Sequence, residues 1–516
     1  MAKEYVVGID IGTTGAKTAI YDIKGNVVGT GYREYSCQYP KPNWVEQDVS
    51  FTTNMAMESA KEAVTTSGVS PGNIASIGLS AQRCCTIFID KSGNPLRPMI
   101  SWQDNRTSIE VEEIKKKISA RDFYQATGLP MNTTWILTKI YWVRKKEPHI
   151  WQNVYKVIQN HDYALKALGA EDYYVDVPDA VFYGVWDTNK FQWSNELLEL
   201  FEIDKNILPK PIPSGTKVGV ISKEAAELTG FLQGTPLCVG AGDQNSAVVG
   251  AGIVFEGTVS VSIGTGGIAI AYLDKPFRDP NEMSMVTNHA VYGKWQLEGY
   301  QAGAASVFRW FRDEIATLEK SFANGHKVDV YKILNELIDR TPAGAKGLVI
   351  LPYFASATAP RWNPDARGTI LGLTFAHDRA CLARAFIEGV TLEEKDIITS
   401  MLKSGIKIKT IRIIGGATKS KVWNQIQADM YKKPVETLRV TDAAVLGAAI
   451  LGGVGVGLFK DIKDGVKKMV TVDQRYEPNS ENSKIYDELY DIYCNAYEGL
   501  NERKVFSKLA KIQEKN

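Results

Sequence analysis

One short motif occurs twice in this chain, about half a chain apart. It reads Ile11-Gly12-Thr13-Thr14-Gly15 near the start and Ile263-Gly264-Thr265-Gly266-Gly267 in the second half. Each copy follows an apolar, strand-like run, and each is followed by a second such run that ends in an aspartate, Asp22 or Asp274. Each copy is therefore predicted to form the tip of a β-hairpin.

The composition of these two tips suits phosphate binding. Glycine lets backbone amides approach an anion closely, and threonine adds a hydroxyl donor. A single tip of this kind is better explained as a structural turn without a ligand. Two tips, one in each half, favour a duplicated fold that holds a nucleotide in a cleft between the halves.

The first tip also has a superficial likeness to a P-loop. A P-loop has four residues between its glycines, a lysine directly after the second glycine, and a helix next. Here the spacing differs, and the stretch from Ala16 to Asp22 alternates polar and apolar residues, as a strand does. A P-loop is therefore not expected.

The bulk composition limits the class of protein. A chain of 516 residues is too long for one hydrophobic core, so we expect two or three domains. The net charge of +1 gives no indication of a nucleic acid or a membrane surface as a partner. Six cysteines without zinc-like spacing indicate reduced thiols in the cytoplasm, and we expect no signal peptide.

The uncharged stretch 443–459 is the part of the chain that most resembles a membrane span. It is short for a span and contains several glycines, among them Gly452 and Gly453. We expect instead a small-residue helix that packs tightly against a neighbour. Both halves otherwise alternate strand and helix, which is typical of α/β domains.

Seven motifs together resemble the FGGY family of carbohydrate kinases, within the wider actin–hexokinase group of ATPases. The resemblance covers nearly the whole chain, and the order and spacing of the motifs make it specific. The signature around 134–146 matches in part, because Ile136 stands where a small or hydroxyl residue is usual. The motifs are Gly8–Thr14, Asn43–Asp48, Trp102–Arg106, Gly242–Gln244, Gly264–Gly266, Asp365–Gly368 and Ile414–Ala417.

The resemblance implies an α/β fold of two duplicated actin-like (ribonuclease H-like) ATPase domains with a cleft between them. Residues 1–252 would bind the sugar and carry the first phosphate loop, 253–475 would bind the nucleotide, and 476–516 would form a C-terminal helical cap. The implied cofactors are ATP and Mg²⁺, and the implied partner is a small sugar or polyol. Relatives often form dimers or tetramers, so a homodimer or homotetramer is open.

Asp243 is the residue that the resemblance identifies as the general base. Phosphoryl transfer to an alcohol requires a group that accepts the hydroxyl proton. Without the resemblance, an aspartate between a strand and a helix is better explained as an N-cap. The resemblance also assigns Gln244 to the sugar and Asp10 to Mg²⁺, an ion that keeps much of its hydration and takes few carboxylates.

The resemblance assigns the nucleotide to residues from both halves. Lysine at position 17 would offset phosphate charge, although a solvent-facing lysine is nearly as good an explanation. A surface charge explains Arg309 equally well, and a helix cap explains Ser420 equally well. The implied contacts are Thr13, Thr14, Lys17, Gly264, Thr265, Arg309, Gly415, Gly416 and Ser420.

The sequence Gln82-Arg83-Cys84 carries the main information on the substrate. Glycerol kinases have Gln-Arg-Glu at this site, and xylulose kinases have Gln-Met-His. Cysteine in place of the glutamate should weaken glycerol recognition, because a polar site specifies its ligand by pairing each hydroxyl. Arg83 would grip a hydroxyl or ketone oxygen, or else pair structurally with Glu46 or Asp104.

The remaining implied sugar contacts are Trp102 and Asp104. A tryptophan wall suits the apolar C–H face of a sugar, although a core tryptophan is a fair alternative. The sequence thus predicts an ATP-dependent kinase that phosphorylates a terminal hydroxyl of a small sugar, with a ketopentose such as xylulose favoured. Glycerol or another polyol is the alternative, and a non-catalytic ATP-dependent switch is less favoured.

Overall fold

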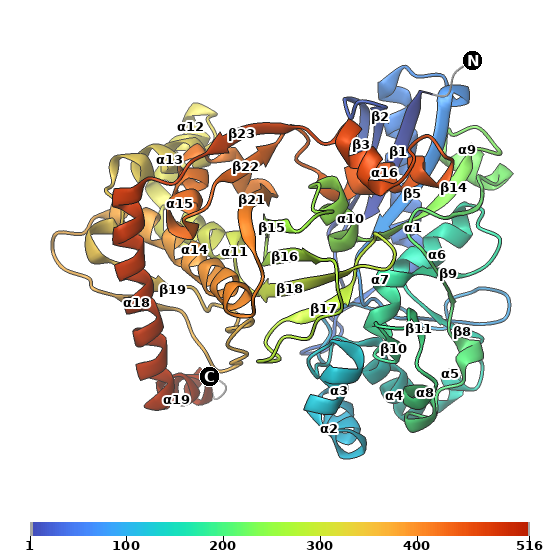
Figure 1. Ribbon diagram of the computed structural model, residues 1–516, viewed down its shortest axis with the longest axis horizontal. Helices are drawn as coiled ribbons and strands as arrows, with labels where there is room; N and C mark the ends of the chain where they lie inside the picture. The colour runs from blue at the N-terminus through green and yellow to red at the C-terminus, as the bar shows by residue number, and fades with distance from the viewer. Residues whose placement is uncertain (1–3, 514–516) are drawn as a thin grey trace.

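Two mixed β-sheets form the centres of two lobes that lie side by side (Figure 1). The structure is a computed structural model and describes residues 4–513. The first lobe is built around a six-stranded sheet, in the order β13 (Lys217–Val220), β14 (Pro236–Gly242), β5 (Ile74–Ala81), β1 (Tyr5–Ile11), β2 (Gly15–Asp22), β3 (Val27–Glu34). The second lobe is built around a seven-stranded sheet, in the order β17 (Met285–Asn288), β18 (Trp295–Gln301), β16 (Gly267–Leu273), β15 (Gly257–Ile263), β21 (Ile408–Ile414), β22 (Val435–Leu438), β23 (Val472–Tyr476).

The two sheets repeat one plan, which confirms the predicted duplication. Strand β1 pairs antiparallel with β2 and parallel with β5, as β15 pairs antiparallel with β16 and parallel with β21. The hairpin tips also match, because the Gly12 amide donates to the Gly15 carbonyl and the Gly264 amide to the Gly266 carbonyl, both at 2.9 Å. A strand follows the first tip, so the rejection of a P-loop is confirmed.

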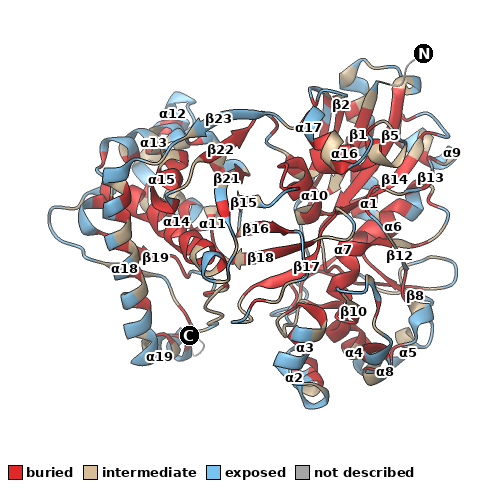
Figure 2. Ribbon diagram, viewed as in Figure 1, coloured by how far each residue is buried: buried red, intermediate tan, exposed pale blue. Residues whose placement is uncertain are grey.

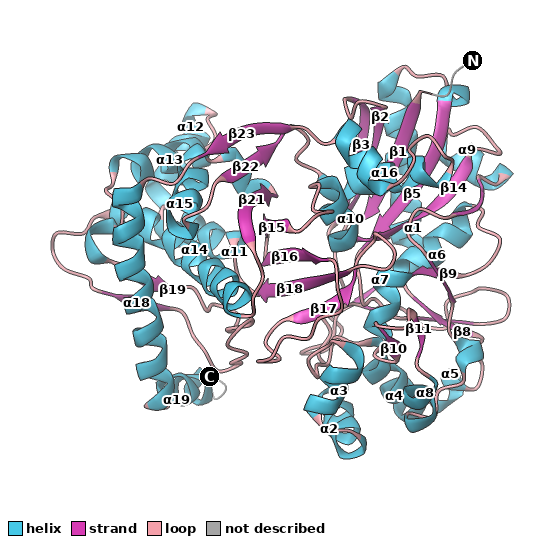
Figure 3. Ribbon diagram, in the orientation of Figure 1, coloured by secondary structure: helices cyan, strands magenta, loops and turns pink. Residues whose placement is uncertain are grey.

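Helices lie beside both sheets (Figure 3). Helix α1 (Val49–Ser67) contacts β2 and β3, and α6 (Asn160–Leu168) contacts β5 and β14. In the second lobe, the long helix α14 (Arg379–Lys403) contacts β16 and β18 and is buried for most of its length (Figure 2). The other helices of this lobe are α11 (Ala305–Trp310), α12 (Thr317–His326), α13 (Val330–Arg340), α15 (Lys421–Tyr431), α18 (Ser480–Glu502) and α19 (Val505–Gln513).

Helix α16 (Ala443–Gly455) follows β22 of the second sheet in the chain but packs on β1, β5 and β14 of the first sheet. It also packs against α10 (Asp243–Gly250). The contact is so close that a Cβ atom added at Gly8 would lie 1.9 Å from the Val445 carbonyl oxygen, and one added at Gly447 would lie 1.8 Å from that of Ser246. The predicted tightly packed small-residue helix is confirmed. Within residues 4–513, every helix is too short or too polar to cross a membrane.

The chain segment that follows β5 and precedes β14 forms a separate layer of the first lobe, with its own aromatic core. The sequence pattern predicts a helix over 132–146, but helix α4 spans Ile136–Lys146 and residues 132–135 form a loop. The pattern also predicts one helix over 304–318, which the structure interrupts with a π-helical turn at Phe311–Ile315. The other helices are α2 (Ser108–Lys117), α3 (Ala120–Thr127), α5 (Pro148–Trp151), α7 (Val177–Ala180), α8 (Asn195–Leu200), α9 (Lys223–Thr229) and α17 (Ile462–Met469).

Five short pairs of strands complete the secondary structure outside the two large sheets. They are β4 (Glu46–Gln47) with β7 (Met99–Ile100), β6 (Ile87–Ile89) with β8 (Lys156–Ile158), β9 (Tyr174–Asp176) with β12 (Lys210–Ile212), β10 (Trp186–Asp187) with β11 (Gln192–Trp193), and β19 (Val349–Leu351) with β20 (Thr369–Leu371).

Candidate functional site

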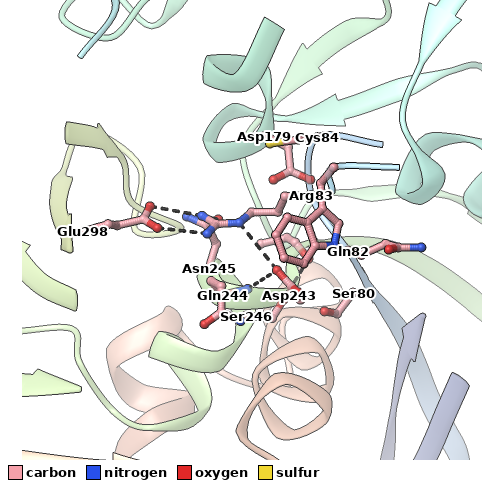
Figure 4. Close-up of polar contacts among 12 residues, drawn as sticks. Ser80, Gln82, Arg83, Cys84, Asp179, Asp243, Gln244, Asn245, Ser246 and Glu298 are labelled. Carbon is pink, nitrogen blue, oxygen red and sulfur yellow. Dashed lines mark hydrogen bonds and ion pairs between the residues drawn. The ribbon is translucent and has the colours of Figure 1, made fainter. Parts of the chain in front are cut away.

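Asp243 lies at the junction of β14 and α10, where the buried strand ends at a glycine. Gly242 is the N-cap and Asp243 is the first helical residue, so the side chain is free of the N-cap role. Its Oδ1 accepts a 2.7 Å hydrogen bond from the Gln244 amide (Figure 4), and the side chain keeps 30% of its surface exposed. Burial raises the pKa of Asp243 and the Arg83 charge opposes that rise, a balance that suits a proton acceptor.

The Asp243 side chain lines a cavity of about 210 Å³, which we call the central pocket. The walls are mainly apolar, with five aromatic side chains, and they come from both halves of the chain. An apolar pocket with a few convergent polar groups is typical of a small-molecule site. The lining residues are Arg83, Cys84, Trp102, Asn132, Thr134, Trp135, Phe182, Asp243, Gln244, Ile268, Met285, Tyr300, Thr358 and Trp362.

Four of the six predicted sugar contacts line the central pocket, and two do not. The Gln82 side chain is buried beside it, where it accepts from the Thr13 hydroxyl at 3.0 Å and donates to Gln47 at 2.8 Å. Asp104 is fully buried, and its Oδ2 accepts from the Val45 amide at 2.6 Å. These hydrogen bonds fix the chain segments around the central pocket, and neither side chain lines its interior.

Arg83 joins the two lobes at the floor of the central pocket (Figure 4). Its Nη1 and Nη2 donate to the two carboxylate oxygens of Glu298 at 3.1 and 2.9 Å, and its Nε lies 3.5 Å from Asp243 Oδ1. The guanidinium also lies over the Phe182 ring, 4.7 Å from its centre.

The alternative pairing of Arg83 with Glu46 or Asp104 is therefore wrong. Those two carboxylates instead form salt bridges with Arg106, whose Nη2 lies 2.8 Å from Glu46 and 2.7 Å from Asp104. Arg106 follows the tryptophan of the same motif in the chain, and its guanidinium stacks on Trp44 with 3.8 Å to the ring centre. This pairing fixes the segment that presents Trp102 to the pocket.

Sequence reasoning missed the pocket residues of the loop before α4, namely Asn132, Thr134 and Trp135. The Asn132 Oδ1 accepts from the Thr134 amide at 3.0 Å, which is an Asx turn. An asparagine followed by two threonines is a turn signal, and it was absorbed into the predicted helix. The second-lobe residue Tyr300 gave no local signal, because tertiary packing alone brings it to the pocket.

Asp10 is the second-last residue of strand β1 and lies next to the first tip. Its Oδ1 accepts from the Ser80 hydroxyl at 2.7 Å, and burial together with the nearby charge of Asp243 raises the pKa of Asp10 to about 7. Within residues 4–513, no three or more His, Cys, Asp or Glu side chains are grouped as a closed metal site. Such a sparse oxygen donor set fits Mg²⁺, which keeps several waters and binds through one or two carboxylates plus substrate phosphates.

Residues in the first tip and just after it already form hydrogen bonds with other parts of the protein. The Thr13 hydroxyl accepts from Trp102 Nε1 at 3.0 Å, which ties the tip to the wall of the central pocket. The Thr14 carbonyl accepts from the Tyr35 amide at 3.0 Å. The Lys17 ammonium donates to the Asp442 carboxylate at the start of α16, so it does not simply face solvent.

A second hollow of about 1030 Å³, which we call the outer groove, lies in the second lobe. Five of the predicted nucleotide contacts line it: Gly264, Thr265, Arg309, Gly416 and Ser420. Ser420 is also the N-cap of α15, and its hydroxyl donates to Asn335 at 2.7 Å. Gly415 is not among the lining residues, but its φ of 91° and its approach to the Ile263 carbonyl need a glycine.

Comparison with known proteins gives full-length similarity. Residues 5–250 match the N-terminal domain of the FGGY family of carbohydrate kinases, and residues 259–456 match its C-terminal domain. Xylulose kinase of Staphylococcus epidermidis is 29% identical over 96% of this chain and 97% of its own. Gluconokinase of Bacillus subtilis is 30% identical over 95% of each chain, and glycerol kinase 2 of Thermotoga maritima is 31% identical over 96% of this chain and 98% of its own.

A solved structure supports the same grouping. The crystal structure of ligand-bound xylulose kinase from Lactobacillus acidophilus superposes with a TM-score of 0.88 at 26% identity. The alignment covers 96% of this chain and 98% of that one. The two-lobed fold is therefore shared over nearly the whole length of this chain.

Proposed function

Because the chain belongs to the FGGY family of carbohydrate kinases, we propose that it transfers the γ-phosphoryl group of ATP to a terminal hydroxyl of a ketopentose such as xylulose. That the chain is an ATP-dependent sugar or polyol kinase follows from the family, and the alternative of a non-catalytic switch is dropped. The observation that carries the proposal is that the Asp243 carboxylate lines the central pocket, whose walls come from both lobes. A cytoplasmic location and a homodimer or homotetramer remain predictions.

Asp243 is proposed to accept the proton of the attacking hydroxyl. As the oxygen forms its bond to the γ-phosphorus, the proton passes to the carboxylate and the bond to the ADP oxygen breaks. The Arg83 guanidinium beside it favours the ionised carboxylate and so opposes the rise in the pKa of Asp243 that burial causes. Gln244 and the Trp102 wall then orient the sugar.

The nucleotide is proposed to lie in the outer groove, with its phosphates directed at the two tips. Gly264 and Thr265 line that groove. Thr13, Thr14 and Lys17 are proposed to contact the phosphates from the first lobe. Asp10 is the residue proposed to hold Mg²⁺, which when bound offsets the charge of the phosphates. Closure of the lobes would exclude water, so that ATP is not simply hydrolysed.

Substitution of Gly416 by valine is expected to raise the KM for ATP about tenfold, a loss of roughly 1.4 kcal/mol. A Cβ at Gly416 meets no protein atom within 4 Å, so the added side chain fills groove space without disturbing the fold. Steady-state kinetics with varied ATP give the measurement. Gly499→Val on exposed helix α18 is the control, since a Cβ there also meets nothing. An unchanged KM would place the nucleotide elsewhere.

The alternative substrate, glycerol, is tested at Cys84. This residue lines the central pocket, is nearly fully buried and has a φ of 61°. Cys84→Glu is expected to raise kcat/KM for glycerol roughly tenfold, because a charged hydrogen bond to a hydroxyl contributes about 1.5 to 3 kcal/mol, part of which offsets burial. Cys84→Gln, of equal size and no charge, is the control. Equal glycerol turnover by both variants would contradict this interpretation of position 84.

The function itself is tested by ADP release across a panel of sugars. D-Xylulose is expected to raise ADP release well above the rate with ATP alone, with glycerol and tetritols as comparison substrates. If no ketopentose, tetrulose or polyol did so, the proposed activity would be refuted.

A further inference from the structure

The central pocket holds a single positively charged group. Among the described residues that line it, Arg83 alone is cationic, and Asp243 alone is anionic. The buried Lys139 lies nearby, but its ammonium donates to the carbonyl oxygens of Cys84 and Thr134 and it does not line the pocket. Whether an anionic substrate can bind in the central pocket therefore depends on whether the positive charge of Arg83 is already paired.

Glu298, from the second lobe, pairs with the charge of Arg83. It lies on β18, its side chain is fully buried, and it binds the Arg83 guanidinium through both oxygens. The carboxylate also accepts from Thr287 at 2.8 Å and from Gln296 at 2.8 Å, so its position is fixed. Although burial opposes ionisation, the charge of Arg83 lowers the pKa of Glu298, and the pair is a salt bridge.

Two carboxylates therefore already share the one cation of the pocket. A substrate carboxylate that approached Arg83 would have to compete with Glu298 at 2.9 Å and Asp243 at 3.5 Å. Whichever carboxylate lost Arg83 would remain charged and unpaired in a site of low polarity, which is strongly unfavourable. A sugar hydroxyl or ketone oxygen has no such cost.

We propose that Glu298 is a specificity-determining residue that restricts this kinase to uncharged sugars and polyols, and that it excludes aldonates. This inference rests on the proposed function and narrows its substrate class. The residue acts through Arg83, because it neutralises the only charge that would attract a carboxylate.

The test compares D-gluconate with D-xylulose and glycerol at constant ionic strength. Wild-type protein is expected to show at least a hundredfold lower kcat/KM for gluconate than for its best neutral substrate. Glu298→Gln, which keeps the shape and removes the charge, is expected to improve the ratio of gluconate to neutral-substrate kcat/KM at least tenfold. The double variant with Arg83→Gln and Glu298→Gln removes both charges and is expected to show no such gain.

Other results would overturn the inference. Efficient gluconate turnover by the wild type would do so, as would an unchanged ratio in Glu298→Gln or an equal gain in the double variant. If Glu298→Gln does not fold, calorimetric titration of the wild type with gluconate and with xylulose decides, and similar affinities refute the selection. Lack of turnover with every neutral compound would instead refute the proposed function, and turnover of gluconate alone would refute both.

Discussion

Replacement of Asp243 by asparagine is expected to lower kcat for sugar phosphorylation by roughly 100- to 10,000-fold, the usual contribution of a general base. The amide keeps the size of the side chain but cannot accept the hydroxyl proton. ATP affinity should change little, because the predicted nucleotide contacts that line the outer groove belong to the second lobe. Steady-state kinetics and a direct nucleotide-binding titration give the two measurements.

The control for this variant is Asp491→Asn, an exposed aspartate on α18 far along the chain from the central pocket. It should leave both kcat and ATP binding unchanged. A variant at position 243 that kept more than a tenth of wild-type turnover would contradict the role of this residue as base. Loss of ATP binding together with turnover would point instead to a structural role.

Replacement of Gly447 by alanine is expected to destabilise the protein by about 1 to 3 kcal/mol, the usual cost of overpacking. The added Cβ would lie 1.8 Å from the backbone carbonyl oxygen of Ser246, and backbone atoms cannot rotate away as a side chain can. Helices α10 and α16 would have to separate. Because α10 begins at Asp243, kcat should fall as well.

The measurement is chemical or thermal unfolding, with Gly499→Ala as the matched control. Gly499 is exposed within helix α18, and a Cβ there meets nothing within 4 Å. Alanine at this position should therefore stabilise the protein by about 0.5 to 1 kcal/mol. The two substitutions are chemically identical and are expected to act with opposite sign. A stabilising effect at position 447 would mean that the two helices are not in close contact.

The sequence was sufficient to predict the duplicated hairpins, because each tip and its flanking strands are local features. It also predicted the small-residue helix at 443–455, since a run of glycine and alanine without charge allows few other outcomes. The family motifs then led to Asp243, Trp102 and Gln244, all of which line the central pocket. These residues follow strand ends or tight turns, where local sequence decides the direction of the chain.

Other features depended on contacts between distant parts of the chain. The partner of Arg83 is Glu298, which lies 215 positions away in the other lobe, whereas the alternative partners that the sequence suggests, Glu46 and Asp104, pair with Arg106. The sequence predicts a helix from 132 onward, whereas residues 132–135 form a loop, because these turn residues directly precede a strongly helical run. Local patterns cannot show which buried cation pairs with which buried anion.

The placement of α16 has a consequence for biosynthesis. A nascent chain that has emerged only as far as residue 442 has made all six strands of the first sheet but lacks the helix that covers β1, β5 and β14. That face would stay bare, or be shielded by a chaperone, until nearly the whole polypeptide had left the ribosome. The two lobes are thus expected to mature together rather than one after the other.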